Sequence, residues 1–471
     1  MIAPCGARRG WFSARPCSTA VLPLGYLSAT IWLLLAGRPT QGAVEIPRLE
    51  AVAPESLTTS PGDQLPKEIA ELQQAVESFQ KQEYERCWEL LGAARKRYPT
   101  LPPARLLLAR FFLAHDLLPP ARVALEQAVT EEPDYPGVYL TFGELALAER
   151  RLTDALLHFE KVGALLERSQ WSEQQRRGVL ARTAAGLASV AAARRDWADA
   201  KKHLTDWLSL EPRSGTARRQ LARVEFALKD QEAAYRDLEQ SAKDDPSLEP
   251  ATVAMGWLYT EQGDFNHARE WMDRAVAAAP KDVKTRLSVA MCLLYQHQPE
   301  KAKPHAEMAA RLDPKSKEAG LLYGSVARHL KAYAEAEAWF EWLHRADPAD
   351  LAVTCQLAHV LVEQADEAKR RRALELAESA VKAEPKSPEG LSTLGWLYYR
   401  LGRPAEAERT LQQAARAAAI LAPDTAYYLA RVLADRGRSA EARDLLKRAL
   451  AAPGIFVRQP EAEQLLRDLT K

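Results

Sequence analysis

The chain has 471 residues, with 64 Lys and Arg against 63 Asp and Glu, so its formal net charge is only +1. Proteins that coat nucleic acid carry a strong basic excess, and this balance therefore argues against nucleic acid as a partner. Five cysteines are too few to staple a scaffold with disulfides. Ala, Leu, Glu and Arg dominate while β-branched residues are sparse, which favours helix nearly throughout and argues against a sheet-based enzyme fold.

The first 43 residues have the features of an export signal. Four arginines and no acidic residue occur in this stretch, and an apolar run covers residues 20–37. Small residues follow at Thr40, Gly42 and Ala43. A basic start, an apolar middle and a small-residue exit predict a secretory signal peptide. Residues 20–37 are also long enough to span a bilayer, so a retained N-terminal membrane anchor is the alternative.

Either alternative places the rest of the chain outside the cytoplasmic membrane. Arginines that precede an apolar segment stay on the cytoplasmic side. We therefore expect an exported protein that is periplasmic, or membrane-anchored and facing the periplasm. Residues 44–66 contain four prolines among Ser, Thr and Gly, and this composition predicts an extended linker.

Prolines then recur through the chain with a fixed spacing. They stand 34 residues apart from 99 to 133, and again from 212 through 246, 280 and 314 to 348. The prolines at 385 and 453 are 68 residues apart, which is two periods. Self-similarity at this length indicates a repeat architecture, which we assign to residues 67–458.

Each period contains two apolar clusters at helical spacing. Residues 255–259 read Met-Gly-Trp-Leu-Tyr, and residues 394–398 read Leu-Gly-Trp-Leu-Tyr. In both, a glycine follows (Gly263 or Gly402) and a second cluster of apolar residues comes after it. Such spacings put the apolar members of a cluster on one helical face. The period therefore predicts a helix–turn–helix hairpin, with proline ending the second helix.

Two places in the period hold small side chains. We predict that they let the two helices of a hairpin approach closely, because a bulky side chain there would overpack the contact at a cost of about 1–3 kcal/mol. The eighth place holds Ala109, Gly143, Ala188, Ala222, Gly256, Ala290, Gly324, Ala358, Gly395 and Ala430. The twentieth place holds Ala121, Ala155, Ala200, Ala234, Ala268, Ala302, Ala336, Ala373, Ala407 and Ala442.

The period and its small residues resemble the tetratricopeptide repeat (TPR), in a protein of an exported bacterial type. The resemblance covers about eleven units. It implies an all-α fold, a helix–turn–helix repeat solenoid with the right-handed superhelix of that family. Residues 459–471 are predicted to form a C-terminal capping helix, since the last apolar face of such an array would otherwise meet water.

Two insertions interrupt the period. Eleven residues are added between about 166 and 178, and we expect them to lengthen helices. Three more fall near residues 366–372, between the helices of one unit, and bring a run of one lysine and three arginines at 369–372. We interpret this basic run as a solvated corner rather than a ligand site.

The sequence has none of the common catalytic motifs. Phosphate-binding loops, nucleophile elbows and zinc-protease motifs do not occur, and no carboxylate pair stands out as general acid and base. The three cysteines after residue 43 fall in different repeats and are interpreted as single buried thiols. His329, His359 and Glu363 could face one groove and bind zinc, although chance placement explains them equally well. We therefore predict no enzyme activity, no cofactor and no metal.

In the TPR family the first helices of successive units line a concave groove, and the resemblance assigns residues of those helices to it. Trp, Tyr, Met and Arg on an accessible surface are typical anchors for a partner. An alternative for Trp257 and Trp396 is that they only fill space between adjacent first helices. The predicted partner-groove residues are Arg223, Trp257, Met291, His359, Trp396, Tyr399, Tyr427 and Arg431.

The groove composition also limits the kind of ligand. Some members of the family grip a C-terminal carboxylate with Lys, Arg and Asn, but the only asparagine of this chain is Asn266, in a predicted inter-helix turn. That clamp cannot be assembled here. A mixed aromatic and basic groove suits an extended or helical peptide instead.

The prediction is a protein–protein interaction scaffold in the cell envelope, which binds a peptide or protein partner in its concave groove. The first alternative is a non-catalytic subunit that presents substrates to a separate enzyme. An enzyme with an unrecognised site and a soluble cytosolic scaffold are further alternatives. The sequence leaves the identity of the partner and the oligomeric state open.

Overall fold

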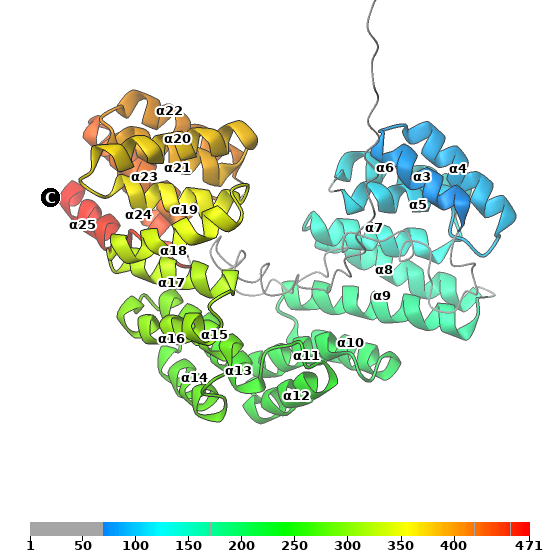
Figure 1. Cartoon of the computed structure of the whole chain (residues 1–471). Coiled ribbons are helices and arrows are strands. Elements are labelled where there is room, and N and C mark those ends of the chain that lie inside the picture. The colour runs from blue at the N-terminus through cyan, green and yellow to red at the C-terminus, as the bar shows by residue number, and fades with distance from the viewer. Residues whose placement is uncertain (1–68, 116, 169–170, 419, 453) are drawn as a thin grey trace, which may run out of the picture. The chain divides into compact units, whose positions relative to one another are not determined.

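A computed structural model describes residues 69–115, 117–168, 171–418, 420–452 and 454–471. The predicted signal or anchor at 1–43 and the predicted linker at 44–66 lie outside these described residues. Within them the chain forms helices α3 to α25 and no strand (Figure 1). The predicted all-α fold is therefore confirmed.

Helices α3 to α24 pack as eleven consecutive antiparallel hairpins among the described residues. Two compact units contain them, one with residues 69–314 and one with residues 315–471, which we call the N-terminal unit and the C-terminal unit. The N-terminal unit consists of α3 (Ala70–Gln80), α4 (Tyr84–Arg97), α5 (Ala104–Ala114), α6 (Leu118–Glu131), α7 (Pro136–Ala148), α8 (Leu152–Arg168), α9 (Glu173–Ala193), α10 (Trp197–Leu210), α11 (Gly215–Ala227), α12 (Gln231–Asp244), α13 (Ala251–Glu261), α14 (Phe265–Ala278), α15 (Val283–Tyr295) and α16 (Pro299–Leu312). The C-terminal unit consists of α17 (Lys317–His329), α18 (Tyr333–Ala346), α19 (Leu351–Val362), α20 (Glu367–Ala383), α21 (Pro388–Arg400), α22 (Pro404–Ala417), α23 (Pro423–Asp435), α24 (Ser439–Ala451) and α25 (Gln459–Thr470).

The small residues of the period lie where the two helices of a hairpin touch. All ten alanines of the twentieth place are completely buried. At the eighth place, a Cβ added to Gly143 would come within 2.5 Å of the Phe159 ring, and one added to Gly395 would come within 2.6 Å of Leu411 Cγ. Real Cβ atoms essentially never approach other atoms so closely. The close approach predicted for these places is confirmed.

The ends of the helices follow the prolines and the turns of the period. In the repeats that carry the proline, the second helix ends two residues before it, as Arg97 does before Pro99 and Ala346 before Pro348. Proline disfavours the α conformation of the residue before it. At the turn inside the hairpin one residue takes a positive φ, for example Lys229 at 70°. Its N–H and the next one bond back to carbonyls of the first helix, which caps that helix.

Both insertions lengthen helices. The eleven extra residues make α8 and α9 unusually long, with 17 and 21 residues. The three residues near 366–372 were predicted to lie between helices, and this prediction is wrong. They extend α20 to 17 residues at its N-terminus. The basic run is correspondingly less solvated than a free corner, because Lys369 pairs with Glu337 and Arg372 with Glu341, both on α18.

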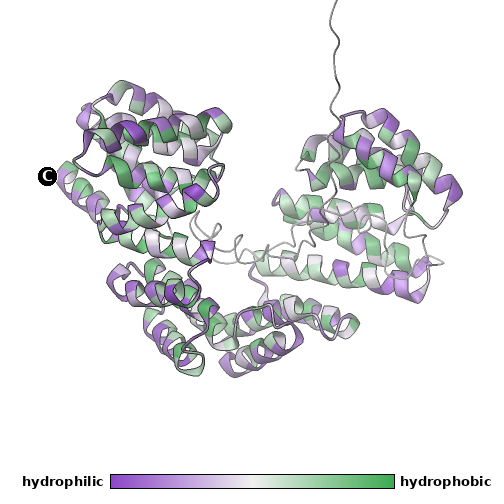
Figure 2. Ribbon diagram, viewed as in Figure 1, coloured by the Kyte–Doolittle hydropathy of each residue, from purple (hydrophilic) through white to green (hydrophobic). Residues whose placement is uncertain are grey.

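Hydrophobic and hydrophilic residues are mixed on the helices of each hairpin (Figure 2). Second helices such as α14 bury one face and expose the other, whereas first helices such as α13 are buried on most sides. The apolar faces form continuous cores, the largest of which runs through the C-terminal unit from Leu321 to Leu465. No helix of the described residues combines the length and the hydropathy that crossing a bilayer requires.

The last helix closes the core of the C-terminal unit. Helix α25 contacts α24 and α23, and it buries Ala462 and Leu465 against them while Glu463 and Arg467 stay on the polar side. The C-terminal capping helix predicted for the solenoid is therefore present.

Candidate partner-binding face of the C-terminal unit

The predicted groove residues divide between the two units. Arg223, Trp257 and Met291 belong to first helices of the N-terminal unit, namely α11, α13 and α15. The remaining five belong to first helices of the C-terminal unit, α19, α21 and α23. We call the surface formed by α17, α19, α21 and α23 the first-helix face of the C-terminal unit. The five residues that it brings together are His359, Trp396, Tyr399, Tyr427 and Arg431.

Most of the predicted anchors are packed inside the hairpins. Five of the eight side chains are between 3 and 7% exposed, whereas Arg223, Tyr399 and Arg431 are half-buried. In this conformation the buried five fill space between helices, and contact of any of the eight with a partner stays a prediction. The five buried residues are Trp257, Met291, His359, Trp396 and Tyr427.

In the N-terminal unit the polar anchor is held by an ion pair. Arg223 on α11 donates to Glu261 on α13 at 3.0 Å. Trp257 meets the ring of Tyr295 edge-on, with centroids 6.3 Å apart. Each pair joins first helices of successive hairpins, so these residues connect neighbouring repeats whatever else they bind.

In the C-terminal unit the aromatic residues form a stack around Tyr428, which is only 1% exposed. Trp396 lies parallel to the Tyr428 ring with centroids 4.3 Å apart, and the His359 ring is 5.6 Å from it. Tyr399 also stacks on Trp396, with centroids 5.2 Å apart. Burial raises the pKa of Tyr427 to about 12. These rings therefore form a packed aromatic cluster between the first helices of the unit.

At the edge of this cluster, Tyr399 and Arg431 share one carboxylate. The Tyr399 hydroxyl donates to Asp435 Oδ2 at 2.6 Å, and Arg431 Nη2 lies 3.2 Å from Asp435 Oδ1. Arg431 Nε also donates to the Tyr399 oxygen at 3.0 Å. These two anchors remain half-buried, and they are the more exposed of the five predicted groove residues in this unit.

The first-helix face curves so strongly that its two ends meet. Arg328 on α17 donates through Nη1 to Gln356 on α19 at 2.7 Å and through Nη2 to the Tyr428 hydroxyl on α23 at 3.2 Å. Arg328 is itself 8% exposed. Helices of the first and the fourth hairpin of this unit are therefore joined directly, and the aromatic anchors between them are enclosed.

Glu363, at the end of α19, is the acceptor on which this enclosed face converges. Its carboxylate accepts from the indole N–H of Trp396 at 3.1 Å and forms ion pairs with Arg400 and Arg458. Its side chain is 7% exposed. All these donors are groups of the protein itself, so the Glu363 carboxylate is fully engaged in contacts within the chain. The described residues contain no cluster of three or more His, Cys, Asp or Glu that could hold a metal ion.

His359, another candidate of the hypothetical zinc site, is also part of the packing. Its Nε2 is 3.2 Å from the Thr393 hydroxyl, which donates its own hydrogen to the Glu389 carbonyl. The imidazole Nε2 must therefore be the donor in its contact with Thr393. Burial, with Arg328 and Arg458 nearby, holds the pKa of His359 well below its usual value. The ring is neutral and serves the core of the face.

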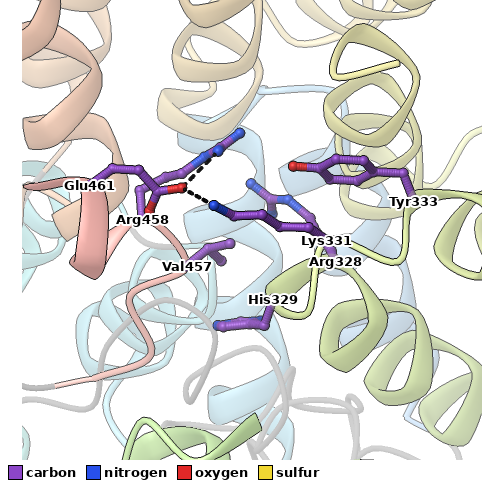
Figure 3. Close-up of a pocket in the computed structure, with 7 residues that line it drawn as sticks. All are labelled: Arg328, His329, Lys331, Tyr333, Val457, Arg458 and Glu461. Carbon is purple, nitrogen blue, oxygen red and sulfur yellow. Dashed lines mark hydrogen bonds and ion pairs between the residues drawn. The ribbon is translucent and has the colours of Figure 1, made fainter. Parts of the chain in front are cut away.

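A segment between the last hairpin and α25 crosses this face. Ile455 and Phe456 are buried, and the backbone N–H groups of Val457 and Arg458 both donate to the Asp424 carboxylate, at 3.2 and 3.1 Å. Figure 3 shows Val457, Arg458 and Glu461 facing Arg328, His329, Lys331 and Tyr333 across a small cavity. That cavity measures only ≈ 10 Å³, about the room that one water needs.

The crossing is fixed by charge as well as by burial. Lys331, in the turn after α17, pairs with Glu461 on α25 at 3.0 Å, and Arg458 lies 3.3 Å from the same carboxylate (Figure 3). Burial opposes the charge of Arg458, yet the neighbouring Tyr428 and Glu363 raise its pKa above the ordinary value. Burial also raises the pKa of Asp424.

Sequence reasoning did not single out Arg328, Asp424, Tyr428 or Arg458. The first three occupy first helices but show no distinctive spacing, because their meeting depends on the curvature of the unit. One signal was available for the segment: residues 455–457 read Ile-Phe-Val between the last repeat and a polar helix, and such a run has to be buried somewhere.

Comparison with known proteins agrees with the repeat pattern. Models of the tetratricopeptide repeat match residues 251–282, 290–350, 364–419 and 392–454. No curated protein matches the sequence. The matched residues include α13 and α14 of the N-terminal unit and most of the C-terminal unit, so the candidate face lies largely within recognised repeats.

Several solved structures resemble the chain at low identity. Yeast Tom70 is 14% identical, over 84% of this chain and 94% of its own, with a TM-score of 0.38. The APC/C hetero-tetramer Cut9–Hcn1 is 11% identical, over 85% of this chain and 89% of its own, also with a TM-score of 0.38. A thermophilic TPR protein of Thermus thermophilus is 19% identical over 40% of this chain and 99% of its own, with a TM-score of 0.35. By the family models and the hairpin geometry, the chain contains tetratricopeptide repeats.

Proposed function

We propose that this protein is a protein–protein interaction scaffold of the cell envelope, which binds a peptide or protein partner along the first helices of its hairpins. One observation carries the proposal: tetratricopeptide repeats recur in both units. Repeats of this kind are typically non-catalytic, and stacked repeats offer extended surfaces that suit partner binding.

The half-buried polar anchors support partner contact at defined places. Arg223 in the N-terminal unit and Tyr399 with Arg431 in the C-terminal unit are accessible parts of first helices. Arginine and tyrosine are enriched among residues that carry binding energy at interfaces. The export signal predicted for residues 1–43 supports the envelope as the place of action.

Site-specific photo-crosslinking in cells tests the proposal. A photoreactive residue in place of Arg223, Tyr399 or Arg431 should capture the same protein or proteins, identified by mass spectrometry. The matched control is Leu157 on the second helix α8, which is 58% exposed and should capture none of them. Equal capture from Leu157, or no capture from any first-helix position, contradicts the proposal.

The same experiment separates the alternative role. A substrate-presenting subunit should crosslink or copurify with a catalytic protein, whereas a general scaffold should yield partners without that common enzyme. Cell fractionation with N-terminal sequencing of the purified chain tests export, since a cytosolic chain would keep residues 1–43 and stay in the cytoplasmic fraction.

A further inference from the structure

The segment 454–458 occupies the first-helix face of the C-terminal unit in the way that a bound peptide would. It contributes apolar side chains to the core, two backbone N–H groups to Asp424 and one guanidinium to Glu363. Glu363 lies 95 residues before Arg458 in the chain. The contacts are thus those of a receptor with a short extended ligand, both supplied here by one chain.

The receptor side of the arginine contact is assembled without Arg458. The carboxylate of Glu363 is already oriented by the Trp396 indole N–H and by Arg400, both from α21. The guanidinium of Arg458 lies 5.6 Å from the centre of the Trp396 ring. A preoriented carboxylate beside an aromatic face is well suited to recognise arginine, which bonds carboxylates and packs on rings at the same time.

The face also recognises the backbone and the residues before the arginine. Asp424, in the first turn of α23, takes the N–H groups of two consecutive residues, Val457 and Arg458. Phe456 is 4% exposed and belongs to the continuous core of the unit. The face therefore recognises a segment of the form phenylalanine, any residue, arginine. The last two residues of that segment must each have a backbone N–H that can donate a hydrogen bond.

The internal occupant does not satisfy its own polar groups completely. Arg458 Nε and Gln459 Oε1 are buried and have no hydrogen-bond partner among the described residues. A buried polar atom without a partner costs about 1–3 kcal/mol. The segment is consequently held less tightly than its buried area would allow.

We propose that the first-helix face of the C-terminal unit is a binding site for a partner segment of the form Phe-x-Arg, and that residues 454–458 are an internal ligand which such a segment displaces. This inference rests on the proposed scaffold function and names the partner class of one of its faces. Glu363 and Trp396 select the arginine, Asp424 selects the two N–H groups, and the core around Phe456 selects the aromatic side chain.

The test uses the full chain and a fluorescent peptide with the sequence of residues 452–460, Ala-Pro-Gly-Ile-Phe-Val-Arg-Gln-Pro. Fluorescence anisotropy measures its binding to the wild-type chain and to a double variant, Phe456→Ser with Arg458→Gln, in which the internal ligand is weakened. The double variant should bind the peptide at least about tenfold more tightly than the wild type, because less of its face is occupied. A peptide with glutamine in place of its arginine should bind the double variant at least about tenfold more weakly.

The Glu363→Gln substitution, added to the double variant, identifies the receptor group. It should remove the preference for the arginine peptide over the glutamine peptide. Circular dichroism must show a wild-type helical signal for each variant, and the single variant Arg458→Gln replaces the double variant if the latter is not folded. Equal binding by wild type and variant, binding by neither, or a preference that survives Glu363→Gln overturns the inference.

Hydrogen exchange on the wild-type chain gives a second measurement that needs no variant. Excess peptide should speed exchange of the Val457 and Arg458 amides, because displacement frees both from Asp424. Unchanged protection at saturating peptide contradicts displacement. If the peptide fails while photo-crosslinking from Arg223 or Arg431 still captures a partner, the Phe-x-Arg site falls and the scaffold function stands.

Discussion

Arg328 on α17 and Tyr428 on α23 are 100 residues apart in sequence and meet through a hydrogen bond of 3.2 Å. Their contact joins the first and the fourth hairpin of the C-terminal unit. An open groove would leave these helices apart, so the bond is a direct sign that the face between them is enclosed. Trp396 and Tyr427, expected to face a partner, are buried on this face.

Removal of this bond should weaken the unit. Tyr428→Phe deletes the acceptor while Arg328 stays buried, and hydrogen bonds to charged groups contribute about 1.5–3 kcal/mol. We expect a loss of that size in the free energy of unfolding, measured by urea titration. Tyr323→Phe is the matched control, since its hydroxyl bonds to Glu335 at an exposed position and its loss should cost less than about 0.5 kcal/mol. Equal losses for the two variants would contradict the role of the buried bond.

In the hairpin of α7 and α8, replacing one glycine by alanine should lower the free energy of unfolding, whereas replacing another should raise it. Gly143→Ala on α7 drives a Cβ into the Phe159 ring, whereas Gly163→Ala on α8 meets nothing within 4 Å. The first should destabilise by about 1–3 kcal/mol through overpacking. The second should stabilise by about 0.5–1 kcal/mol, because alanine is the better helix former. Urea unfolding of both variants checks the pair, and a gain for Gly143→Ala would show that the helices can separate without cost.

The hairpins could be predicted from the sequence because their determinants are local and periodic. Small residues such as Ala268 and turn residues such as Gly402 recur at fixed places, and each acts only on the adjacent helix. The enclosed face could not be predicted in the same way. Trp396 contacts Tyr428, Glu363 and Arg458, which belong to other hairpins and to the segment before α25. The positions of these groups result from small rotations summed over several hairpins.

The polar residues of the candidate site also show that local sequence patterns do not reveal contacts between distant parts of the chain. Glu363 attracted attention through its spacing to His359, four residues away, which suggested a metal site. Its actual partners are Trp396, Arg400 and Arg458, up to 95 residues on. A pattern within one helix could not reveal them, since they come from α21 and from the segment before α25.

The turns inside the hairpins offer a further prediction. Lys229 has a φ of 70°, in the left-handed region, where Gly263 and Gly402 stand in equivalent turns at 78° and 75°. A side chain in this region costs about 1–2 kcal/mol. Lys229→Gly should therefore stabilise the N-terminal unit, by up to about 1 kcal/mol after the larger chain entropy of glycine is counted.

The reverse substitution supplies its control. Gly263→Ala places a side chain at the same kind of turn, with open space around it, so only backbone strain can act. It should destabilise by about 1–2 kcal/mol. Urea midpoints of the two variants should move in opposite directions, and a shared direction would mean that these turns do not hold the left-handed conformation.

Glu389, in the first turn of α21, should make stability depend on pH. Burial, with Asp350 nearby, raises the pKa of its carboxyl from 4.5 to about 7. Between these values the unfolded chain has released the proton while the folded chain still holds it. Stability therefore falls as pH rises through this range, and the full loss is present above pH 7.

Glu389→Gln should remove this loss of stability at higher pH, because the glutamine side chain stays neutral at every pH. The variant should be more stable than the wild type by about 1–3 kcal/mol at about pH 8, and the difference should vanish at about pH 4, where the wild-type carboxyl is protonated in both states. Other groups, such as His359 and Asp424, titrate alike in both proteins and cancel from the comparison. Urea unfolding at the two pH values measures the difference. A constant difference, or a gain at acid pH alone, would mean that Glu389 is ionised in the folded chain over the whole range.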